Sequence, residues 1–395
     1  MELAFTRSEE AFREEVREFF KNNLSSELAR REAQGFHLER KDLSAWQRIL
    51  YDKGWVAPNW PVEFGGSGWS PTQRYLFEVE YGLANAPELD PIALSMVGPV
   101  LYRFGSAQQR ERYLDPILKG EMWFCQGFSE PQAGSDLASL KTQAVRNDSG
   151  YVLNGQKTWT TAAHMADYMV CLARTNPQGK PQASLSMFIV PMDAPGVTVR
   201  PIETIDGDHS VNEVFLDNVA IPFDHLIGEE NSGWTQAKFL LGNERTHNAY
   251  IGILKRYLAR IPAMIEAEAD NGLSPASAEA LMRKHARLEM DVNALEWSVL
   301  RTLASDDSPA LGAAASGLKV RGSEYLLRAS DLENEILGPQ TLPRFAPHDH
   351  EPLHARASAN APGRSSRYLY WRASTIFGGT NEIQRSIIWN TMFKR

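Results

Sequence analysis

Two short segments decide the fold: residues 376–385, IFGGTNEIQR, and residues 127–136, GFSEPQAGSD. The first opens the last helical stretch of the chain, where unpaired backbone N–H groups and the helix dipole favour an anion. The second lies where helical periodicity gives way to short β-type runs, and its glycines and serines let the backbone approach a ligand closely. Both segments therefore predict ligand-contacting loops at the joints between structural units.

Composition limits the classes of protein to consider. The chain has 395 residues, 43% of them hydrophobic, enough for a large core and two or three domains. A net charge of -8 provides no basic footprint for nucleic acid. The two cysteines, Cys125 and Cys171, exclude a disulfide framework and are interpreted as core residues. Without an apolar run of 18 residues or a signal-like N-terminus, the sequence predicts a soluble cytoplasmic protein with no membrane span.

Helical patterns dominate the first 120 residues. Thr6 and Glu9 predict a capping box, which starts an amphipathic helix whose apolar residues include Phe12 and Val16. A loop rich in proline and glycine follows at 58–68. Helical spacing then resumes in three stretches, at 75–81, 91–104 and 108–118.

Between about 122 and 230 the pattern changes to short β-branched and aromatic runs. The Asn154-Gly155 pair separates the run 151–153 from the run 156–161, and predicts two strands joined by a tight type I′ turn. Further strand candidates lie at 169–173, 186–190, 197–200 and 214–216. Their short spacing predicts a small antiparallel barrel or sandwich without helices.

Helical periodicity returns after Gly233. The helices expected here cover 234–269, a stripe from Leu281 to Leu303, 309–337 and 380–393, and they predict a four-helix bundle. A proline-rich loop is expected at 338–366. It holds His348, His350 and His354, which we interpret as surface residues because no cysteine or helical His pair completes a metal site.

The chain is therefore predicted to be an α+β multidomain protein with an all-α domain at 1–121, a small antiparallel β domain at 122–231 and a helical bundle at 232–395. This order, together with the two opening segments, resembles the acyl-CoA dehydrogenase family. The resemblance covers essentially the whole chain. In its sequence segments the chain most resembles the large subunit of pimeloyl-CoA dehydrogenase and related bacterial enzymes.

The resemblance implies that FAD is the cofactor. Within 126–135 it implies flavin contacts by Gln126, Phe128, Ser129, Gly134 and Ser135. Ser129 is expected near the pyrimidine edge of the ring, and Ser135 is expected to touch the acyl-CoA as well. Gln126 departs from the aromatic residue that is common in relatives at its position.

A second flavin element is implied by Trp159, Thr160 and Thr161, which resemble the family's Trp-x-Thr sequence. There the indole packs against the isoalloxazine ring and the threonine bonds near flavin N5. The alternative for Trp159 is an ordinary core aromatic. In the C-terminal segment the resemblance implies cofactor contacts by Thr380, Asn381 and Glu382 and a substrate contact by Gly379.

Removal of the α-proton of an acyl-CoA requires a base, and the position of the base is unusual here. Gly378 stands where the best-known members carry the catalytic glutamate. One subset, including the isovaleryl-type enzymes, places the base on the helix that opens the C-terminal bundle, and Glu244 falls on that position. Glu244 is therefore the candidate catalytic base, with a helix-surface ion pair as its alternative. Arg245 resembles a residue near bound CoA, or is a structural partner.

Two family elements that reach the neighbouring subunit's FAD are missing. Arg-x-x-Phe-Gly and Gln-x-x-Gly-Gly are replaced here by ADNGL at 269–273 and EILGP at 335–339. We interpret this as half of a hetero-oligomer, in which a sister acyl-CoA dehydrogenase subunit supplies the missing arginine. The alternative is a homo-oligomer in which Arg283, Lys284 or an arginine of the 338–366 loop replaces it.

The activity implied by the resemblance is FAD-dependent α,β-dehydrogenation of an acyl-CoA to a trans-2-enoyl-CoA, as in fatty acid metabolism, with electrons passed to an electron-transfer flavoprotein. Two alternatives stay open. One is a flavin oxidase or monooxygenase on the same fold, and the other is a non-catalytic subunit of a heteromeric dehydrogenase.

Overall fold

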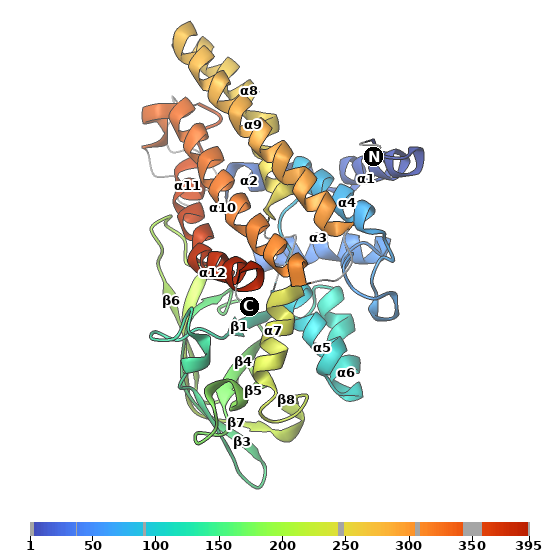
Figure 1. The fold of residues 1–395 in the computed structure, drawn as a ribbon, viewed down its shortest axis with the longest axis vertical. Helices are drawn as coiled ribbons and strands as arrows, with labels where there is room; N and C mark the ends of the chain where they lie inside the picture. The colour runs from blue at the N-terminus through green and yellow to red at the C-terminus, as the bar shows by residue number, and fades with distance from the viewer. Residues whose placement is uncertain are drawn as a thin grey trace.

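The computed structural model describes residues 4–36, 38–89, 92–243, 249–304, 309–342 and 358–393. Helices form both ends of the chain and a sheet forms its middle (Figure 1). In Figure 1 the helical bundle lies above the sheet, and the N-terminal helices α1 and α4 lie to one side. The predicted α+β architecture of three successive units is thus confirmed.

The N-terminal unit is helical, as predicted. Its helices are α1 (Arg7–Asn23), α2 (Ser26–Gln34), α3 (Arg40–Lys53), α4 (Pro71–Leu83), α5 (Gly98–Phe104) and α6 (Ala107–Leu118), with the π-helical segment η2 (Ile92–Val97) before α5. The predicted capping box is present, because Thr6 Oγ1 accepts from Glu9 N and Thr6 N donates to Glu9 Oε2. The apolar face of α1 is buried through Phe12, Val16 and Phe20.

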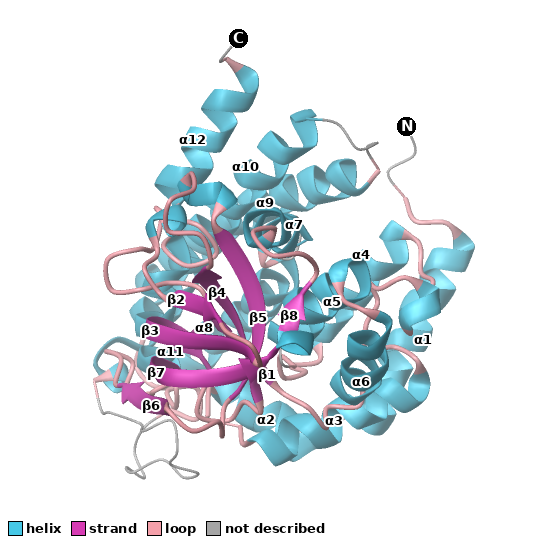
Figure 2. Ribbon diagram, turned by 90° about the horizontal axis from the view of Figure 1, so that it is seen from below, coloured by secondary structure: helices cyan, strands magenta, loops and turns pink. Residues whose placement is uncertain are grey.

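The middle unit is one sheet of eight strands. They are β1 (Phe124–Gly127), β2 (Gln143–Arg146), β3 (Gly150–Thr161), β4 (Tyr168–Arg174), β5 (Leu185–Pro191), β6 (Val197–Ile202), β7 (Val211–Pro222) and β8 (Leu226–Ile227). The order is β6-β7-β3-β2-β4-β5-β8, and β1 pairs with β4. Most pairs are antiparallel, as predicted, but β4 runs parallel to both β1 and β2. Figure 2 shows the strands curving past one another beside α5 and α7.

Two hydrophobic clusters explain the near-continuous apolar run of β4. Met169 and Cys171 face a cluster enclosed by the sheet, whereas Val170 and Leu172 face the main core shared with the helices. A strand buried on both faces carries apolar residues at consecutive positions. Cys125 and Cys171 are buried free thiols, as predicted, and burial raises the pKa of Cys171 to about 11.

The predicted hairpin turn at Asn154-Gly155 is wrong. The chain continues as β3 through these residues, which lie at an irregularity in its pairing with β7. Glycine is needed here for close approach rather than for a turn, since a Cβ at Gly155 would lie 2.3 Å from Thr142 Oγ1 on the adjoining segment. The short helices η3 (Leu137–Ser139), η4 (Pro181–Ala183) and η5 (Phe223–His225) also correct the expectation of a middle unit without helices.

The C-terminal unit contains the predicted bundle. Its helices are α7 (Gly233–Asn243), α8 (Ile251–Asp270), α9 (Pro275–Leu303), α10 (Pro309–Leu337), α11 (Arg364–Trp371) and α12 (Asn381–Met392). Helix α10 contacts α8, α9 and α12, and α8 contacts α9. Helices α9, α10 and α12 follow the predicted bounds closely.

Two predictions for this unit are wrong. The single helix expected at 234–269 is two helices, because α7 ends at Asn243 and Tyr250, with φ of 55°, lies in the left-handed region that cannot continue an α-helix. The loop expected up to residue 366 ends earlier, at Gly363, where α11 begins. His348, His350 and His354 lie outside the described residues. In the described ranges no helix has the length and apolar character to cross a bilayer.

Buried ion pairs fix the N-terminal helices against the bundle. Glu32 Oε1 on α2 accepts from Arg256 Nη1 at 3.0 Å and from Arg367 Nη2 at 3.1 Å. Deeper in the bundle, Arg260 and Arg364 face Glu333. Burial and the neighbouring Arg260 lower the pKa of Arg364 to about 10, while Glu333 opposes that shift. These contacts make the helical units one framework on which the candidate site is built.

Candidate flavin-contacting site

A buried ion pair joins the two β-domain segments named from the sequence. Lys157 Nζ donates to Glu130 Oε1 at 2.8 Å and to the carbonyl of Phe128 at 3.3 Å. The two charged side chains are only 0% and 2% exposed. Beside them the backbone N–H of Thr158 donates to the carbonyl of Ser129 at 3.0 Å. The loop 127–136 and the end of β3 therefore form a single rigid surface.

Glu130 is held as a carboxylate inside this surface. Burial alone would raise its pKa, but the Lys157 charge and hydrogen bonds from Lys157, Thr142 and Lys141 outweigh burial, so the pKa lies below its ordinary value. The backbone N–H groups of Lys141 and Thr142 donate at 2.6 and 2.9 Å. Sequence reasoning named neither Glu130 nor its role, although Glu130 lies inside the quoted segment.

Trp159 projects from this surface instead of entering the core. Its side chain is 60% exposed, and its φ of 57° places it in the left-handed region. The pairing of β3 with β7 shifts between Lys157 and Thr160, so Trp159 sits on a bulge. An exposed indole on a strained backbone fits a ligand contact better than the core alternative, because such strain concentrates at functional sites.

Several buried polar atoms near this segment lack a hydrogen-bond partner among the described residues. They include Nε2 of Gln126 on β1, Oγ1 of Thr160 on β3 and Oδ1 of Asn212, which lies opposite Thr160 on β7. A buried polar atom left unpaired costs about 1–3 kcal/mol, so such atoms point to a missing partner. A planar heterocycle with carbonyl and N–H groups along its edge, which a flavin has, fits these atoms and the exposed indole. The residues present are thus compatible with FAD.

The other residues expected to contact the flavin in the β domain differ in exposure. Ser135, Gly134 and Thr161 are exposed, and Ser129 is half-buried. The side chain of Phe128 packs in the main core, which leaves mainly its backbone for a ligand contact. The hydrogen bonds of Lys157 and Thr158 to the 128–130 backbone and side chains bring the loop 127–136 next to the end of β3, which carries Trp159, Thr160 and Thr161.

The C-terminal segment forms the N-terminus of α12. Thr380 is the N-cap, and its Oγ1 accepts from Ile383 N at 3.2 Å. Gly378 and Gly379 precede it with φ of 65° and 81°, a backbone that favours glycine. Glu382 is exposed in the first turn, where a carboxylate suits the helix dipole.

Asn381 differs from its neighbours because its side chain is buried. Its Oδ1 accepts from Lys319 Nζ at 2.9 Å, and its Nδ2 donates to Ser323 Oγ at 3.1 Å. The side chain therefore anchors α12 to α10, and the cofactor contact expected for Asn381 stays a prediction. Burial lowers the pKa of Lys319 to about 8, against an opposing effect of Glu382.

The catalytic candidates Glu244 and Arg245 lie outside the described residues. The described chain stops at Asn243, the last residue of α7, and resumes at Ala249. Of the basic residues considered as replacements for the missing arginine, Arg283 is paired with Glu279 and Lys284 with Glu335, all on exposed surface, and Arg364 from the 338–366 range is buried against Glu333. Within the described part of the chain, no group of three His, Cys, Asp or Glu side chains is arranged to hold a metal.

Comparisons with known proteins cover nearly the whole chain. Residues 6–121, 125–219 and 231–393 match the family models for the N-terminal, middle and C-terminal domains of acyl-CoA dehydrogenase. Acyl-CoA dehydrogenase FadE29 of Mycobacterium tuberculosis is 34% identical over 98% of this chain and 97% of its own length. Acyl-CoA dehydrogenase IpdE1 of the same organism is 33% identical, with 96% of each chain covered.

Two solved structures share the fold at somewhat lower identity. The Tcur3481-Tcur3483 steroid ACAD is 29% identical, with a TM-score of 0.83 over 99% of this chain and 98% of that one. The ChsE4-ChsE5 complex from Mycobacterium tuberculosis is 30% identical, with a TM-score of 0.82 and the same coverage of both chains.

Proposed function

We propose that this chain, which belongs to the acyl-CoA dehydrogenase family, oxidises an acyl-CoA thioester to a trans-2-enoyl-CoA and passes the electrons to an electron-transfer flavoprotein. Its cofactor is FAD, as family membership implies. When bound, FAD supplies the acceptor for the hydride that leaves Cβ.

One observation supports the flavin site most directly. The exposed, left-handed Trp159 lies beside the unpaired Thr160 Oγ1, on a surface that the Lys157–Glu130 pair joins to the 127–136 loop. Trp159 offers a flat apolar face, and Gln126 and Thr160 offer buried polar atoms. In this arrangement the indole covers one face of a ring while the polar atoms set its orientation in the plane.

Glu244 is the proposed base. Removal of the α-proton requires a carboxylate close to Cα, and such a carboxylate works best in a desolvated position that raises its pKa. Gly378, which occupies the usual position of the base, has no side chain, and its φ of 65° disfavours a side chain there. Glu244 follows directly on α7 in the sequence, and Arg245 beside it is proposed to lie near the bound CoA.

The test of this assignment is Glu244→Gln in the full-length protein. The substitution keeps the shape but removes the proton acceptor, so turnover should fall on the order of 10²- to 10⁴-fold while flavin absorbance and acyl-CoA binding persist. Glu266→Gln, at an exposed position on α8, is the matched control and should retain activity. A Glu244→Gln variant with the wild-type rate would eliminate Glu244 as the base.

The relatives suggest a substrate class to test first. One solved structure that is similar over the whole chain is described as a steroid ACAD. We therefore place CoA thioesters of steroid side chains first in a substrate panel, beside straight-chain, branched and dicarboxylic acyl-CoAs. The ratio of kcat/KM values across the panel identifies the class.

A sister subunit is proposed to complete the FAD site. Neither ADNGL at 269–273 nor EILGP at 335–339 contains an arginine, and Arg283 and Lys284 are paired elsewhere. The similar ChsE4-ChsE5 structure is a complex of two differently named proteins. Expressed alone, this chain should bind FAD substoichiometrically, because one charge-assisted contact worth about 1.5–3 kcal/mol is absent. One tightly held FAD per lone chain, with full activity, would instead favour a homo-oligomer.

Reaction with oxygen separates the dehydrogenase from a flavin oxidase or monooxygenase on the same fold. A dehydrogenase should turn over anaerobically with an electron-transfer flavoprotein or an artificial acceptor, and slowly with oxygen. The reverse pattern would support the oxidase alternative. A protein that binds no flavin even with its sister chain would support the non-catalytic alternative.

A further inference from the structure

Two residues with left-handed backbone flank the threonines of the proposed flavin segment. Trp159 has φ of 57° and Ala162 has φ of 56°, with Thr160 and Thr161 between them. A single residue other than glycine rarely adopts this conformation, and two within four residues persist only when the surroundings hold them there. The question is which residues do so.

The side chain of Asn212, at the start of β7, is hydrogen-bonded to this segment. Its side chain is completely buried, and it lies opposite Thr160 in the register of the sheet. Its Nδ2 donates to the carbonyl oxygen of Thr160 at 3.2 Å and lies 3.2 Å from His164 Nδ1. Two residues after Thr160, the backbone N–H of Ala162 donates to the carbonyl of Ser210 at 2.9 Å. The start of β7 thus secures the segment between its two strained residues.

The hydrogen bond to Thr160 determines the state of His164. A carbonyl oxygen only accepts, so the atom of Asn212 that faces it is the amide nitrogen. That nitrogen is a donor, and His164 Nδ1 opposite it must therefore accept, which requires a neutral imidazole with its proton on Nε2. A protonated His164 would present N–H to N–H at 3.2 Å. Turning the amide over would relieve this conflict but would place Oδ1 against the Thr160 carbonyl.

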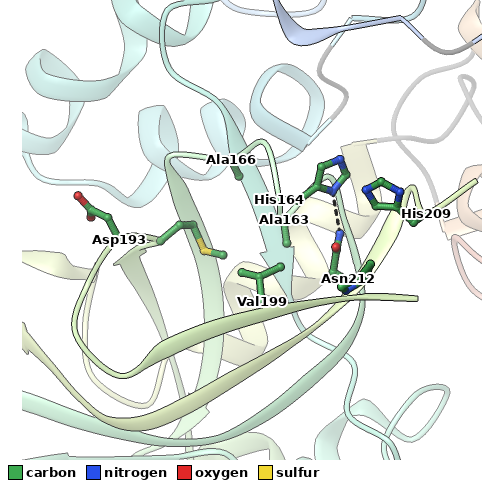
Figure 3. A pocket seen from close by; sticks show the side chains of 9 residues that line it. Ala163, His164, Ala166, Asp193, Val199, His209 and Asn212 are labelled. Carbon is green, nitrogen blue, oxygen red and sulfur yellow. Dashed lines mark hydrogen bonds between the residues drawn. The ribbon is translucent and has the colours of Figure 1, made fainter. Parts of the chain in front are cut away.

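Protons can reach His164 because it is exposed at the rim of a cavity. The cavity has a volume of about 460 Å³ and is bounded by the β3–β4 connection, the turn after β5, and β6 and β7. Figure 3 shows the His164 and His209 rings side by side above Asn212, with Asp193 on the opposite side. The two rings are 4.6 Å apart between centroids. His209 and Asp193 are the other titratable side chains that line this cavity.

We propose that Asn212 and His164 are positioning residues for the flavin segment, and that protonation of His164 releases the hold of Asn212 on Thr160. This inference rests on the proposed function, since it concerns how the segment that carries Trp159 and Thr161 is presented to the cofactor. Neither residue is proposed to touch substrate or flavin. The expected consequence is a loss of FAD affinity when His164 takes up a proton, because Nδ1 then no longer accepts from Asn212.

The positioning itself is tested without flavin, by hydrogen exchange on the full-length chain. Asn212→Leu keeps the approximate volume but removes the donor to Thr160. Exchange at the amide of Ala162 should accelerate roughly 10-fold or more, because the carbonyl of Thr160, two residues earlier, loses its hydrogen bond from Asn212. Amides of β4 should be unchanged and serve as the internal control. Unchanged exchange at Ala162 would overturn the positioning role.

The link to the cofactor is tested by FAD affinity at two pH values, with the sister chain present if the complex requires it. Wild-type affinity should fall about 2- to 10-fold more than that of His164→Gln between roughly pH 8 and pH 5.5. Glutamine can accept from Asn212 but does not titrate, and His164 is exposed, so the variant should fold. His209→Gln should keep the wild-type pH dependence.

These readouts separate the failure of the inference from the failure of the proposed function. Equal pH dependence in wild type and His164→Gln overturns the role of His164. Normal FAD affinity in Asn212→Leu, despite faster exchange at Ala162, overturns the link between this pair and the cofactor. A chain that binds FAD with the expected pH dependence but oxidises no acyl-CoA leaves the positioning pair intact and removes only the proposed activity.

Discussion

Two buried lysines lie behind the two halves of the candidate site, and they are paired differently. Lys157, on the β side, faces the carboxylate of Glu130 at 2.8 Å. Lys319, on the helical side, donates to the neutral amide oxygen of Asn381 at 2.9 Å. Burial lowers the pKa of Lys319 to about 8, while the pKa of Glu130 is lowered despite burial because Lys157 and several hydrogen bonds favour its charge.

This difference indicates two ways of holding a cofactor loop. On the β side a complete charge pair and backbone bonds hold the 127–136 loop against β3 over a wide pH range. On the helical side the hydrogen bonds of Asn381 with Lys319 and Ser323 hold the start of α12 to α10, and burial disfavours the charge on Lys319. Substitution of the partners should therefore have unequal effects.

The largest effect is expected from Glu130→Gln, which leaves the Lys157 ammonium buried without its carboxylate. The free energy of unfolding should fall by about 3–5 kcal/mol in chemical denaturation. Glu279→Gln, which breaks the exposed pair with Arg283, is the matched control and should cost at most about 1 kcal/mol. A loss at Glu130 no larger than in the control would contradict the distinction between buried and exposed pairs.

Acid should reduce this difference between wild type and Glu130→Gln. The folded-state pKa of Glu130 is lower than its ordinary 4.5, so its contribution is complete above pH 4.5 and is lost as the pH falls through the folded-state value. Denaturation midpoints of the two proteins should therefore converge at low pH.

A smaller effect is expected from Asn381→Leu on the helical side. The substitution removes the acceptor of Lys319 and the donor to Ser323, and unpaired buried groups of this kind cost about 1–3 kcal/mol. Asn293→Leu is the control, because Asn293 accepts from Lys255 at an exposed position. If thermal unfolding showed equal losses for both variants, the Lys319 network would have no special role.

The protonation of Lys319 provides a sharper contrast between the two sides. Its folded-state pKa of about 8 lies below the ordinary value of 10.5, so the unfolded chain binds more protons between these values. Stability should therefore rise as the pH increases from about 8 to 10.5, and this contribution should vanish in Lys319→Met. The comparison of the two proteins separates Lys319 from tyrosines that titrate in the same range. Parallel pH curves for the two proteins would refute this assignment.

The smallest expected effect concerns Trp159, whose ring lies on the β side. Trp159→Ala should weaken FAD retention through lost contact area, plus roughly 0.5–1.5 kcal/mol for the aromatic pair. Trp297→Ala, at another exposed position on α9, is the matched control and should leave FAD affinity unchanged. Unchanged affinity in Trp159→Ala would show that the indole has no part in the site.

Sequence patterns correctly predicted the elements that depend on residues a few positions apart. The capping box of Thr6 and Glu9 involves residues three apart, and the stripe of α9 follows helical spacing. The bounds of α10 were predictable because the helix starts at Pro309 and is followed by Gly338 and Pro339. The three-part architecture followed from the order of helical and β-type patterns along the chain.

Elements that depend on pairing with distant segments were predicted wrongly or not at all. Asn154-Gly155 has the composition of a hairpin turn, but the pairing of both its flanks with β7 keeps it within one strand. Strands β1 and β2 carry only four residues each and were not identified. The end of α7 and the left-handed Tyr250 interrupt an apolar pattern that continues through them, so periodicity alone could not place the break.

The amino-acid pattern was sufficient for the capped and strongly periodic helices and for the order of helical and β-type regions, because these depend on residues a few positions apart. Tertiary structure alone decided which distant groups meet: Lys157 with Glu130, 27 positions away, Asn212 with Thr160, 52 away, and Lys319 with Asn381, 62 away. These pairs depend on strand register and helix packing, and no local spacing encodes them. They also bury charged and polar atoms at the candidate site, where water cannot replace a lost hydrogen-bond partner.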